Sequence, residues 1–373
     1  MKILHTESSL GWGGQEIRVL TEARGVARRG HEVAIAAPRE ARIFAEAPAY
    51  GVEIIELPIA RKRISGAAAV HRLLAARPFD VVNTHSSTDS WLATLAIALA
   101  QDSTAIVRTR HVSSPVPRNF ASRWLYARAD RIVTTGEKLR LQVIEEVGAD
   151  PARTVSIPTG IDLARFHPGD RAAARAQLHL PPQAPIVGIV ATLRSWKGHM
   201  HLLEAMASLG RPEARLVVVG DGPMREALER RTGELGLAAR VTFAGNQRDV
   251  APWLHAFDLF CLPSYANEGV PQALAQAMAC ALAIVTTPVG SIAELVEDGR
   301  TGVIVPPSDP PALARAIAGL LDDPSRRAAL GAAALEEARL RLGEDAMVDA
   351  MIRVFADAMR ASSAPPRGSA RSD

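Results

Sequence analysis

The chain has 373 residues, 48% of them apolar, and its 43 basic and 40 acidic side chains leave a formal net charge of +3. This composition excludes a disordered or fibrous protein, and the length predicts two domains that each bury a core. The two cysteines, Cys261 and Cys280, lie in apolar stretches and are too few for a disulfide framework or a four-cysteine metal site, so a reducing compartment is expected.

No stretch of the sequence approaches the roughly 18 consecutive apolar residues that a transmembrane helix requires. The N-terminus carries one lysine followed by His5, Thr6 and Glu7, which is not the pattern of a signal peptide. We therefore expect a cytoplasmic protein, whose contact with the inner face of the cytoplasmic membrane would be peripheral.

The first 168 residues alternate short β-branched runs with helical patterns, which predicts βαβ units around a parallel sheet. Several of the runs are apolar throughout, as expected for strands covered on both faces. The predicted strands span residues 1–5, 32–36, 53–57, 81–85, 105–108, 131–135 and 154–158.

A glycine-rich turn, residues 11–14, follows the first strand and opens the first helix. Phosphate-binding loops lie at this place, because small residues allow close approach and a helix N-terminus offers unpaired N–H groups. The dinucleotide fingerprint requires a third glycine at position 16, where Glu16 stands, so binding of a pyrophosphate as in NAD enzymes is disfavoured. A tight turn without a ligand is the alternative.

The strand and helix pattern restarts after Pro168 and predicts a second parallel sheet within residues 169–343. Its strands are expected at residues 186–191, 215–219, 241–244, 259–262, 283–287 and 302–305, with helical stretches at about 310–340 and 344–360. Residues 362–373, rich in Ser, Pro, Ala and Arg, are predicted to form a disordered tail. The fold class is therefore α/β, with two Rossmann-like parallel-sheet domains.

Two polar turns of the second half follow strands, where ligands of open α/β sheets bind. The first carries Arg194 and Lys197, two cations that suit a phosphate group, with solvated surface charge as the alternative. The second carries Glu268 beside the backbone N–H groups of Gly269 and Val270. Donors next to a carboxylate suit a polyhydroxylated ligand.

With these motifs the sequence resembles the retaining glycosyltransferases of family 4, which have the GT-B fold, over essentially the whole chain to about residue 360. The matching segments, in family order and spacing, are residues 13–14, 156–162, 166–168, 197–198, 219–223, 268–271 and 287–290. A closer resemblance is to bacterial enzymes that assemble cell-envelope polysaccharide and the lipopolysaccharide core.

The resemblance implies two domains that face each other across a cleft, with the acceptor on residues 1–168 and the nucleotide-sugar donor on residues 169–343. It also implies that the helix over residues 344–361 crosses back to the first domain. Arg194 and Lys197 would hold the diphosphate of the donor. Backbone N–H groups of Gly13 or Gly14 would reach the diphosphate from the first domain.

The remaining donor-binding residues are also implied by the resemblance. Glu268 and the residues after it would hold the sugar hydroxyls; these residues are Gly269, Val270 and Gln272. Residues around Gly245 would meet the base. His111 matches the family's active-site histidine, which hydrogen-bonds the donor sugar, although a lone histidine after a strand is more often structural.

The sequence departs from the family pattern at several positions. Gln276 replaces the second acidic residue, and because an amide accepts and donates where a carboxylate accepts twice, ribose binding should be weaker or different. Thr192 stands where the family often has an arginine, so the phosphate role falls to Arg194. The other departures are Ala281 and Ala283, in place of a usual glycine and proline, and Gln15, in place of alanine.

The chemistry expected of such an enzyme is expulsion of a nucleoside diphosphate, so the cations should stabilise the charge that develops on the leaving phosphate. No acidic pair of the DxD type stands at a strand end, and we expect no metal ion or other cofactor. Asp322 and Asp323 beside Pro324 are interpreted as a helix cap. Retention through front-face transfer is the expected mechanism, with Glu268 as a covalent nucleophile as the variant.

The acceptor is predicted from the charge of the first domain. Eight basic residues lie within residues 108–140, namely Arg108, Arg110, Arg118, Arg123, Arg128, Arg131, Lys138 and Arg140. Arg61, Lys62 and Arg63 form another cluster. Such an excess favours a lipid-linked or lipopolysaccharide-core saccharide acceptor, or an anionic membrane, with a solvated face as the alternative. Nucleic acid fits poorly, because neither cluster is expected to carry interleaved aromatic platforms.

The sequence thus predicts a glycosyltransferase, and two other functions stay open. A sugar-nucleotide epimerase has the same fold and needs no acceptor. A degenerate sugar-nucleotide-binding module is suggested by Gln276.

Overall fold

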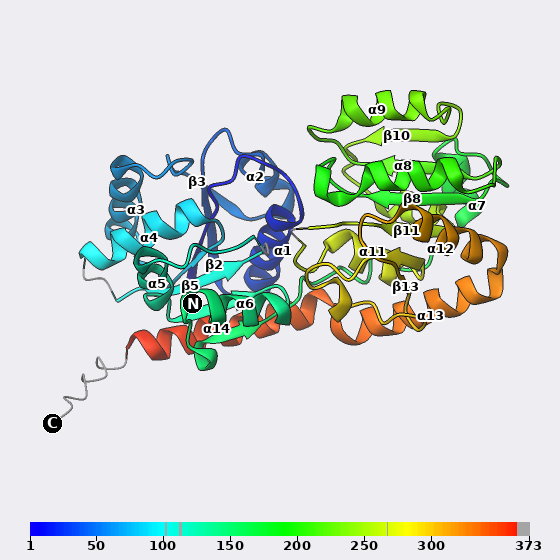
Figure 1. Cartoon of the computed structure of the whole chain (residues 1–373). Helices are drawn as coiled ribbons and strands as arrows, with labels where there is room; N and C mark the ends of the chain where they lie inside the picture. Colours follow the sequence, from blue (N-terminus) through cyan, green and yellow to red (C-terminus); the bar gives the residue numbers. More distant parts are fainter. Residues whose placement is uncertain (101–102, 112–113, 267, 364–373) are drawn as a thin grey trace. The chain divides into compact units, whose positions relative to one another are not determined.

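The structure, a computed structural model, describes residues 1–100, 103–111, 114–266 and 268–363, which form two compact units (Figure 1). The first unit comprises Met1–His111, Pro115–Ile157 and the described residues from Asp345 onward. The second comprises Pro158–Glu344 together with Ser114. Each unit is a parallel α/β sheet covered by helices, which confirms the predicted fold class.

The first unit is built on a seven-stranded sheet with the strand order β3-β2-β1-β4-β5-β6-β7, in which all neighbours are parallel. The strands are β1 (Lys2–Thr6), β2 (Glu32–Ala37), β3 (Glu53–Glu56), β4 (Val81–Thr84), β5 (Ala105–Arg110), β6 (Arg131–Thr134) and β7 (Thr154–Ser156). The order reverses between β1 and β4, and the carboxyl edge at such a switch point is where ligands of open α/β sheets bind.

Helices cover both faces of this sheet. They are α1 (Gly14–Arg28), α2 (Arg42–Glu46), α3 (Ile64–Ala76), α4 (Ser87–Ala100), α5 (Phe120–Ala127), α6 (Glu137–Val147) and α14 (Glu344–Ser362), with short 3₁₀ turns at Ala47–Tyr50 and Pro151–Arg153. One apolar cluster joins the sheet to α1, α2 and α14, and a second joins it to α3, α4, α5 and α6. Successive residues of β1 alternate between the two clusters, Ile3 in one and Leu4 in the other.

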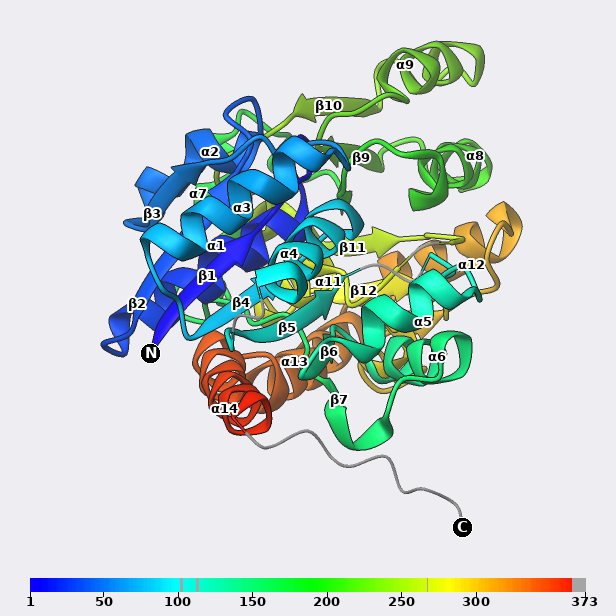
Figure 2. The same ribbon diagram turned by 90° about the vertical axis from the view of Figure 1, so that its left-hand side faces the viewer.

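The helix α14, which follows the second unit in sequence, packs on the first unit, and both views show it beside this unit's sheet (Figures 1 and 2). Its buried residues follow helical spacing: Met347, Val348, Met351, Val354, Phe355 and Ala358. Gly25 of α1 packs so closely against it that a Cβ there would overlap the Val348 side chain. The helix continues through Ser362, and residues 364–373 of the predicted tail lie outside the described residues.

The second unit has a six-stranded parallel sheet with the order β10-β9-β8-β11-β12-β13. The strands are β8 (Ile186–Val190), β9 (Arg215–Val219), β10 (Val241–Gly245), β11 (Leu259–Leu262), β12 (Ala283–Thr286) and β13 (Val303–Ile304). The helices are α7 (Arg171–Gln177), α8 (His199–Ser208), α9 (Arg225–Glu234), α10 (Ala251–Ala256), α11 (Gln272–Ala279), α12 (Pro310–Asp322) and α13 (Pro324–Arg341). The strand order reverses between β8 and β11, so the turns after these two strands flank the switch point.

The thirteen strands found among the described residues lie where the sequence predicts them, within two residues at either end. The helical pattern over residues 310–340 is divided into α12 and α13. The Asp323 side chain accepts a hydrogen bond from the Arg326 N–H and caps α13, as expected, whereas Asp322 forms an ion pair with Arg211. In the part of the chain that the structure describes, every helix is too short or too polar to cross a bilayer.

Candidate active site

Glycines hold together the turns at the carboxyl edge of the second unit's sheet. Gly198 ends the turn after β8 with a φ of 76°, and a Cβ there would overlap the Pro263 carbonyl oxygen of the turn after β11. Gly290, after β12, has a φ of 61° and would likewise overlap the Glu268 carbonyl oxygen. Glycine at these two positions allows both the left-handed backbone conformation and the close approach. The three turns are therefore packed in direct contact.

This packing brings Lys197 and Glu268 together. The Lys197 Nζ lies 2.6 Å from Oε1 of Glu268, and the Ser264 hydroxyl donates to the same oxygen at 2.6 Å. Glu268 is 3% exposed, whereas the Lys197 side chain retains 19% of its accessible surface. A buried carboxylate and a partly exposed ammonium group are therefore fixed side by side at the switch point.

The Arg194 side chain is placed differently from that of Lys197. Arg194 is exposed, and its guanidinium group lies over the Trp196 ring at 5.7 Å from the ring centroid. The Trp196 carbonyl accepts a hydrogen bond from the Tyr265 N–H at 2.8 Å, which ties the two turns together again. The structure thus unites Lys197 with Glu268, and places the second predicted cation on the neighbouring tryptophan.

The start of α11 contains most of the other predicted donor-binding residues. Gly269 and Val270 are buried immediately before Pro271, the N-cap of this helix. The side-chain Oε1 of Gln272 is buried and has no hydrogen-bond partner among the described residues. Gln276, one turn later on the same face of α11, is 8% exposed.

Gly245 lies apart from these residues, at the end of the edge strand β10. It has a φ of 71°, and its carbonyl oxygen accepts a hydrogen bond from the Gly220 N–H at 2.8 Å. Two strands, β9 and β8, separate β10 from β11 in the sheet.

In the first unit, the predicted glycines begin α1. Gly13 is the N-cap of this helix and Gly14 is its first residue. The next side chain, Gln15, donates to Oε2 of Glu7 at 2.6 Å and to the Ser86 hydroxyl at 2.9 Å. These bonds give a structural reason for a glutamine where the family often has alanine.

Two buried carboxyl groups, neither of which was predicted as a site residue, lie close to this turn. Burial and the nearby carboxylates of Asp89 and Glu16 raise the pKa of Glu7 to about 8. Burial raises the pKa of Asp89 to about 6, although Asp89 accepts hydrogen bonds from Thr6, Ser8 and the first amides before α4. Ser86 and Asp89 have the spacing of a capping box, which is the sequence signal that could have located this cluster.

His111 follows β5 and belongs to a row of three imidazoles. Its Nε2 lies 3.0 Å from Nδ1 of His85, and Nε2 of His85 lies 2.9 Å from Nδ1 of His5. Burial lowers the pKa of His5 to about 3 and that of the other two well below the usual range. Only His111 was predicted as a site residue, although each histidine lies at the carboxyl end of one of three neighbouring strands.

Much of the basic excess predicted over residues 108–140 is bound within the first unit. The Arg108 guanidinium group is buried over the Tyr126 ring, and Arg110 donates to the Tyr126 hydroxyl at 3.4 Å. Two further ion pairs neutralise cations of this cluster: Arg118 with Glu145, and Arg140 with Glu137. The fold thus reduces the cationic surface expected from the sequence.

A second cationic surface does carry aromatic side chains, which corrects the expectation from sequence. Lys62 lies over the Trp91 ring at 5.7 Å, Trp91 stacks on Trp124 at 5.8 Å, and Arg128 lies over Trp124 at 5.5 Å. These four residues, here called the cation–aromatic surface, come from the segment before α3, from α4, and from α5 with the residue after it. Trp124 and Arg128 lie within the basic cluster of residues 108–140, and the fold brings them together with Lys62 and Trp91 from two other segments.

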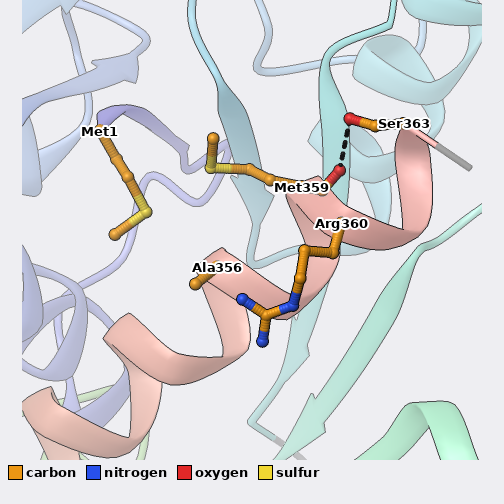
Figure 3. Close-up of a pocket in the computed structure, with 5 residues that line it drawn as sticks. All are labelled: Met1, Ala356, Met359, Arg360 and Ser363. Carbon is orange, nitrogen blue, oxygen red and sulfur yellow. Dashed lines mark hydrogen bonds between the residues drawn. The ribbon is translucent and has the colours of Figure 1, made fainter.

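An open hollow lies between the start of β1 and the end of α14 (Figure 3). It is lined by Met1, Ala356, Met359, Arg360 and Ser363, and contains no predicted site residue. Because Met1 precedes β1, the hollow lies at the amino edge of the sheet, away from the switch point. Within the described ranges, His, Cys, Asp and Glu side chains form no group of three that could hold a metal ion.

Comparison with known proteins covers both units. Residues 12–165 match the family model described as Glycosyltransferase Family 4, and residues 184–323 match that described as Glycosyl transferases group 1. The D-inositol 3-phosphate glycosyltransferase of Mycobacterium ulcerans is 32% identical over 347 residues, which span 83% of this chain and 74% of the relative.

Solved structures share the fold over nearly the whole chain. Anabaena Alr3699/HepE in complex with UDP matches with a TM-score of 0.83 at 22% identity, over 95% of this chain and 100% of that one. WaaG, described as a glycosyltransferase involved in lipopolysaccharide biosynthesis, matches with a TM-score of 0.71 at 20% identity, over 93% of this chain and 99% of that one.

Proposed function

Because this chain belongs to glycosyltransferase family 4 and is therefore an enzyme that uses nucleotide-sugar donors, we propose that its acceptor is a lipid-linked or lipopolysaccharide-core saccharide. We further propose that transfer retains the configuration of the sugar and needs no metal ion. The observation that carries the donor half of this proposal is the Lys197–Glu268 pair at the carboxyl edge of the second sheet.

In this proposal Lys197 and the start of α11 act on the leaving group. The bond between the anomeric carbon and the diphosphate oxygen breaks, and negative charge develops on that oxygen. The Lys197 ammonium group and the N–H groups of Gly269 and Val270 would stabilise this charge, because they are in place before the reaction. Arg194, next to them on the surface, would bind the outer phosphate oxygens.

Glu268 serves the sugar in this proposal. When the diphosphate engages Lys197, the Glu268 carboxylate becomes available to accept hydrogen bonds from sugar hydroxyls. The acceptor hydroxyl then bonds to the anomeric carbon on the face that the diphosphate leaves, and its proton passes to the leaving phosphate oxygen. Glu268 is therefore a binding residue rather than a nucleophile.

The first unit would supply further donor contacts. Gly13 and Gly14 place unpaired N–H groups at the N-terminus of α1, where an anion is stabilised. His111 offers a neutral imidazole to a sugar hydroxyl, because burial and the Arg18 and Arg110 cations disfavour its protonation.

The cation–aromatic surface supports a lipid-linked acceptor. Trp91 and Trp124 are partly exposed between two cations, and Ile64 and Phe120 nearby in sequence are 90% and 83% exposed. Tryptophan, exposed apolar residues and cations together suit the headgroup region of an anionic membrane. We propose that this surface brings the enzyme to the membrane that carries the acceptor.

A soluble inositol phosphate is the second candidate acceptor. It is favoured by the 32% identity with an enzyme named for D-inositol 3-phosphate. Both candidates carry negative charge, which the cations of the first unit would attract.

The donor half is tested with a panel of nucleotide sugars and the variant Lys197→Ala. We expect one donor to raise the thermal stability of the wild type, and Lys197→Ala to lower kcat/KM about 100-fold, the usual effect of removing one preorganised electrostatic group. Lys2→Ala is the matched control, because Lys2 also faces a glutamate, at 3.8 Å, but at the exposed amino end of β1. Undiminished activity of Lys197→Ala would contradict the donor site.

The acceptor half is tested with the productive donor. Transfer to a lipid-linked saccharide in anionic vesicles, but not to inositol phosphate in solution, is the expected result. The opposite result would establish the second candidate. An epimer formed from the donor alone, without any acceptor, would overturn the transferase proposal in favour of the isomerase.

A further inference from the structure

His5, His85 and His111 form a hydrogen-bonded row at the carboxyl ends of three adjacent strands. His5 lies in β1, and His85 and His111 follow β4 and β5, three strands adjacent in the order β1-β4-β5. Because side chains alternate along a strand, these residues lie on the face of the sheet covered by α1 and α14, as do Ile3, Val81 and Val107. Their exposed fractions are 0%, 5% and 9%.

The environment of all three imidazoles favours their neutral form at pH 7. Burial is the main cause that lowers their pKa values, and the nearby Arg18 guanidinium group adds to the effect at His85 and His111. A neutral imidazole carries one N–H, so it donates from one ring nitrogen and accepts at the other. The two hydrogen bonds among these three rings therefore allow only two arrangements. Either His5 donates to His85 and His85 to His111, or His111 donates to His85 and His85 to His5.

The environment of His5 selects the direction. Nε2 of His5 is buried and has no hydrogen-bond partner among the described residues, and the Phe355 ring, whose centroid lies 6.1 Å from that of His5, offers no nitrogen or oxygen. If His111 were the first donor in the row of hydrogen bonds, Nε2 of His5 would carry a buried N–H without an acceptor, and buried N–H groups of this kind are rare in native structures. If His5 is the first donor, its Nδ1 carries the hydrogen and donates it to His85.

We propose that His5 and His85 are positioning residues that fix His111 in the tautomer with its hydrogen on Nδ1. His5 donates from Nδ1 to Nε2 of His85, and His85 donates from Nδ1 to Nε2 of His111. His111 then has its Nε2 occupied and presents an N–H at Nδ1. On the proposed function, on which this last step rests, that N–H meets an oxygen of the donor sugar, and the ring cannot act there as a base.

The tautomers are measured on the full chain labelled with ¹⁵N-histidine, by long-range ¹H–¹⁵N correlation at pH 7 without ligand. Protonated and unprotonated nitrogens of a neutral imidazole have different ¹⁵N shifts, and single-histidine variants assign the signals. We expect the Nδ1–H form at all three histidines. An Nε2–H form or a charged ring at His111 would overturn the inference.

Two variants test whether the row sets the tautomer. His85→Phe keeps a ring in the core but removes the donor to His111, so the His111 signal should change to the Nε2–H form or to a mixture. His5→Phe should also shift the balance at His111, although His5 does not contact that ring. His71→Asn is the control, because His71 is exposed on α3, and it should leave the His111 signal unchanged. An unchanged His111 signal in both phenylalanine variants would refute the positioning role.

Activity adds a separate readout. His85→Phe should lower kcat/KM about tenfold, because a misdirected N–H loses one hydrogen bond to the substrate. A folded variant is verified by its near-ultraviolet circular dichroism. Because the tautomers are measured without substrate, failure of the transferase proposal would leave them unchanged, whereas failure of the inference would leave sugar transfer intact.

Discussion

Gln276 is the residue that most separates this chain from the family pattern. It lies on α11, one turn after Gln272 and 8% exposed, at the edge of the proposed donor site. If Gln276 faces the ribose, its amide accepts only one hydroxyl where a carboxylate would accept both.

The substitution Gln276→Glu should therefore tighten the binding of UDP. We expect about a tenfold lower Kd, because a hydrogen bond to a charged group contributes about 1.5–3 kcal/mol compared with about 1 kcal/mol for a neutral bond. Isothermal titration calorimetry measures the change, with the exposed Gln177→Glu on α7 as control. Equal affinity of Gln276→Glu and the wild type would exclude the ribose assignment.

Single residues also show which parts of the site the sequence could reveal. Lys197 and Glu268 were predicted, because each follows an apolar strand within a family motif. His5 and His85 were missed, because their contact with His111 depends on the strand order β1-β4-β5, which differs from the order in sequence. Part of the cation–aromatic surface was missed for a similar reason, because Lys62 and Trp91 come from segments separate from Trp124 and Arg128.

At the scale of the element, α11 ends in a strained conformation. The N–H groups of Ala281 and Leu282 donate to Met278 and Ala277, which is the pattern of a Schellman motif. Ala281 occupies its left-handed position, with a φ of 58°, where the family usually has glycine. A Cβ in this region costs free energy that glycine avoids.

Ala281→Gly should therefore stabilise the second unit by about 1 kcal/mol. The same substitution at the exposed Ala332 within α13 should destabilise it by about 1 kcal/mol, because there glycine only loses helix propensity. Urea unfolding of both variants compares the two signs. Loss of stability in Ala281→Gly would contradict the strain assigned to this position.

The packing of α1 on α14 gives a second prediction at this scale. Gly25→Ala should destabilise the first unit by about 1–3 kcal/mol, because its Cβ overlaps the buried Val348 side chain. In a Val348→Ala background the overlap is absent, and the alanine should be neutral or stabilising, since it favours the helix by about 1 kcal/mol.

A double-mutant cycle by urea unfolding measures this coupling. Gly319→Ala in α12 is the control, because its Cβ would enter open space, and it should stabilise the protein. Additive effects of Gly25→Ala and Val348→Ala would show that the two helices are not in the contact described.

At the scale of the whole molecule, the two units should respond differently to pH. The buried carboxyl groups of the first unit have raised pKa values, about 8 for Glu7, 7 for Glu22 and 6 for Asp89. The folded unit therefore binds more protons than the unfolded chain, so these groups reduce stability as pH rises through this range. The buried histidines act oppositely, but only below their usual pKa of 6.5.

Above pH 6.5 only the carboxyl effect remains, and the stability of the first unit should fall towards pH 8. Glu7→Gln should flatten this fall by up to about 1.4 kcal/mol per pH unit, the slope of one proton. Hydrogen exchange of the amides in β1 and β4 reports on this unit alone, with the exposed Glu40→Gln as control. An undiminished slope in Glu7→Gln would exclude Glu7 as its source.

The architecture of both units could be predicted almost completely, because their strands are apolar runs and their connections are short. The first unit's seven strands and the second unit's six carry this signal individually. The contacts between distant segments could not be predicted from the sequence, because they depend on the tertiary structure. The ion pair of Arg118 with Glu145 is an example.

The packing of α14 on the first unit also affects the order in which the two units fold during synthesis. The second unit, Pro158–Glu344, is nearly continuous in sequence, so it can complete its core while the ribosome is still adding residues. The first unit is begun earlier, yet its face over α1 and β1 remains uncovered until α14 emerges. Domains usually fold in the order of synthesis, N-terminal first. Here we expect the second unit to complete its fold first. The first unit would complete its fold only after α14 is synthesised, and it would depend on chaperones until then.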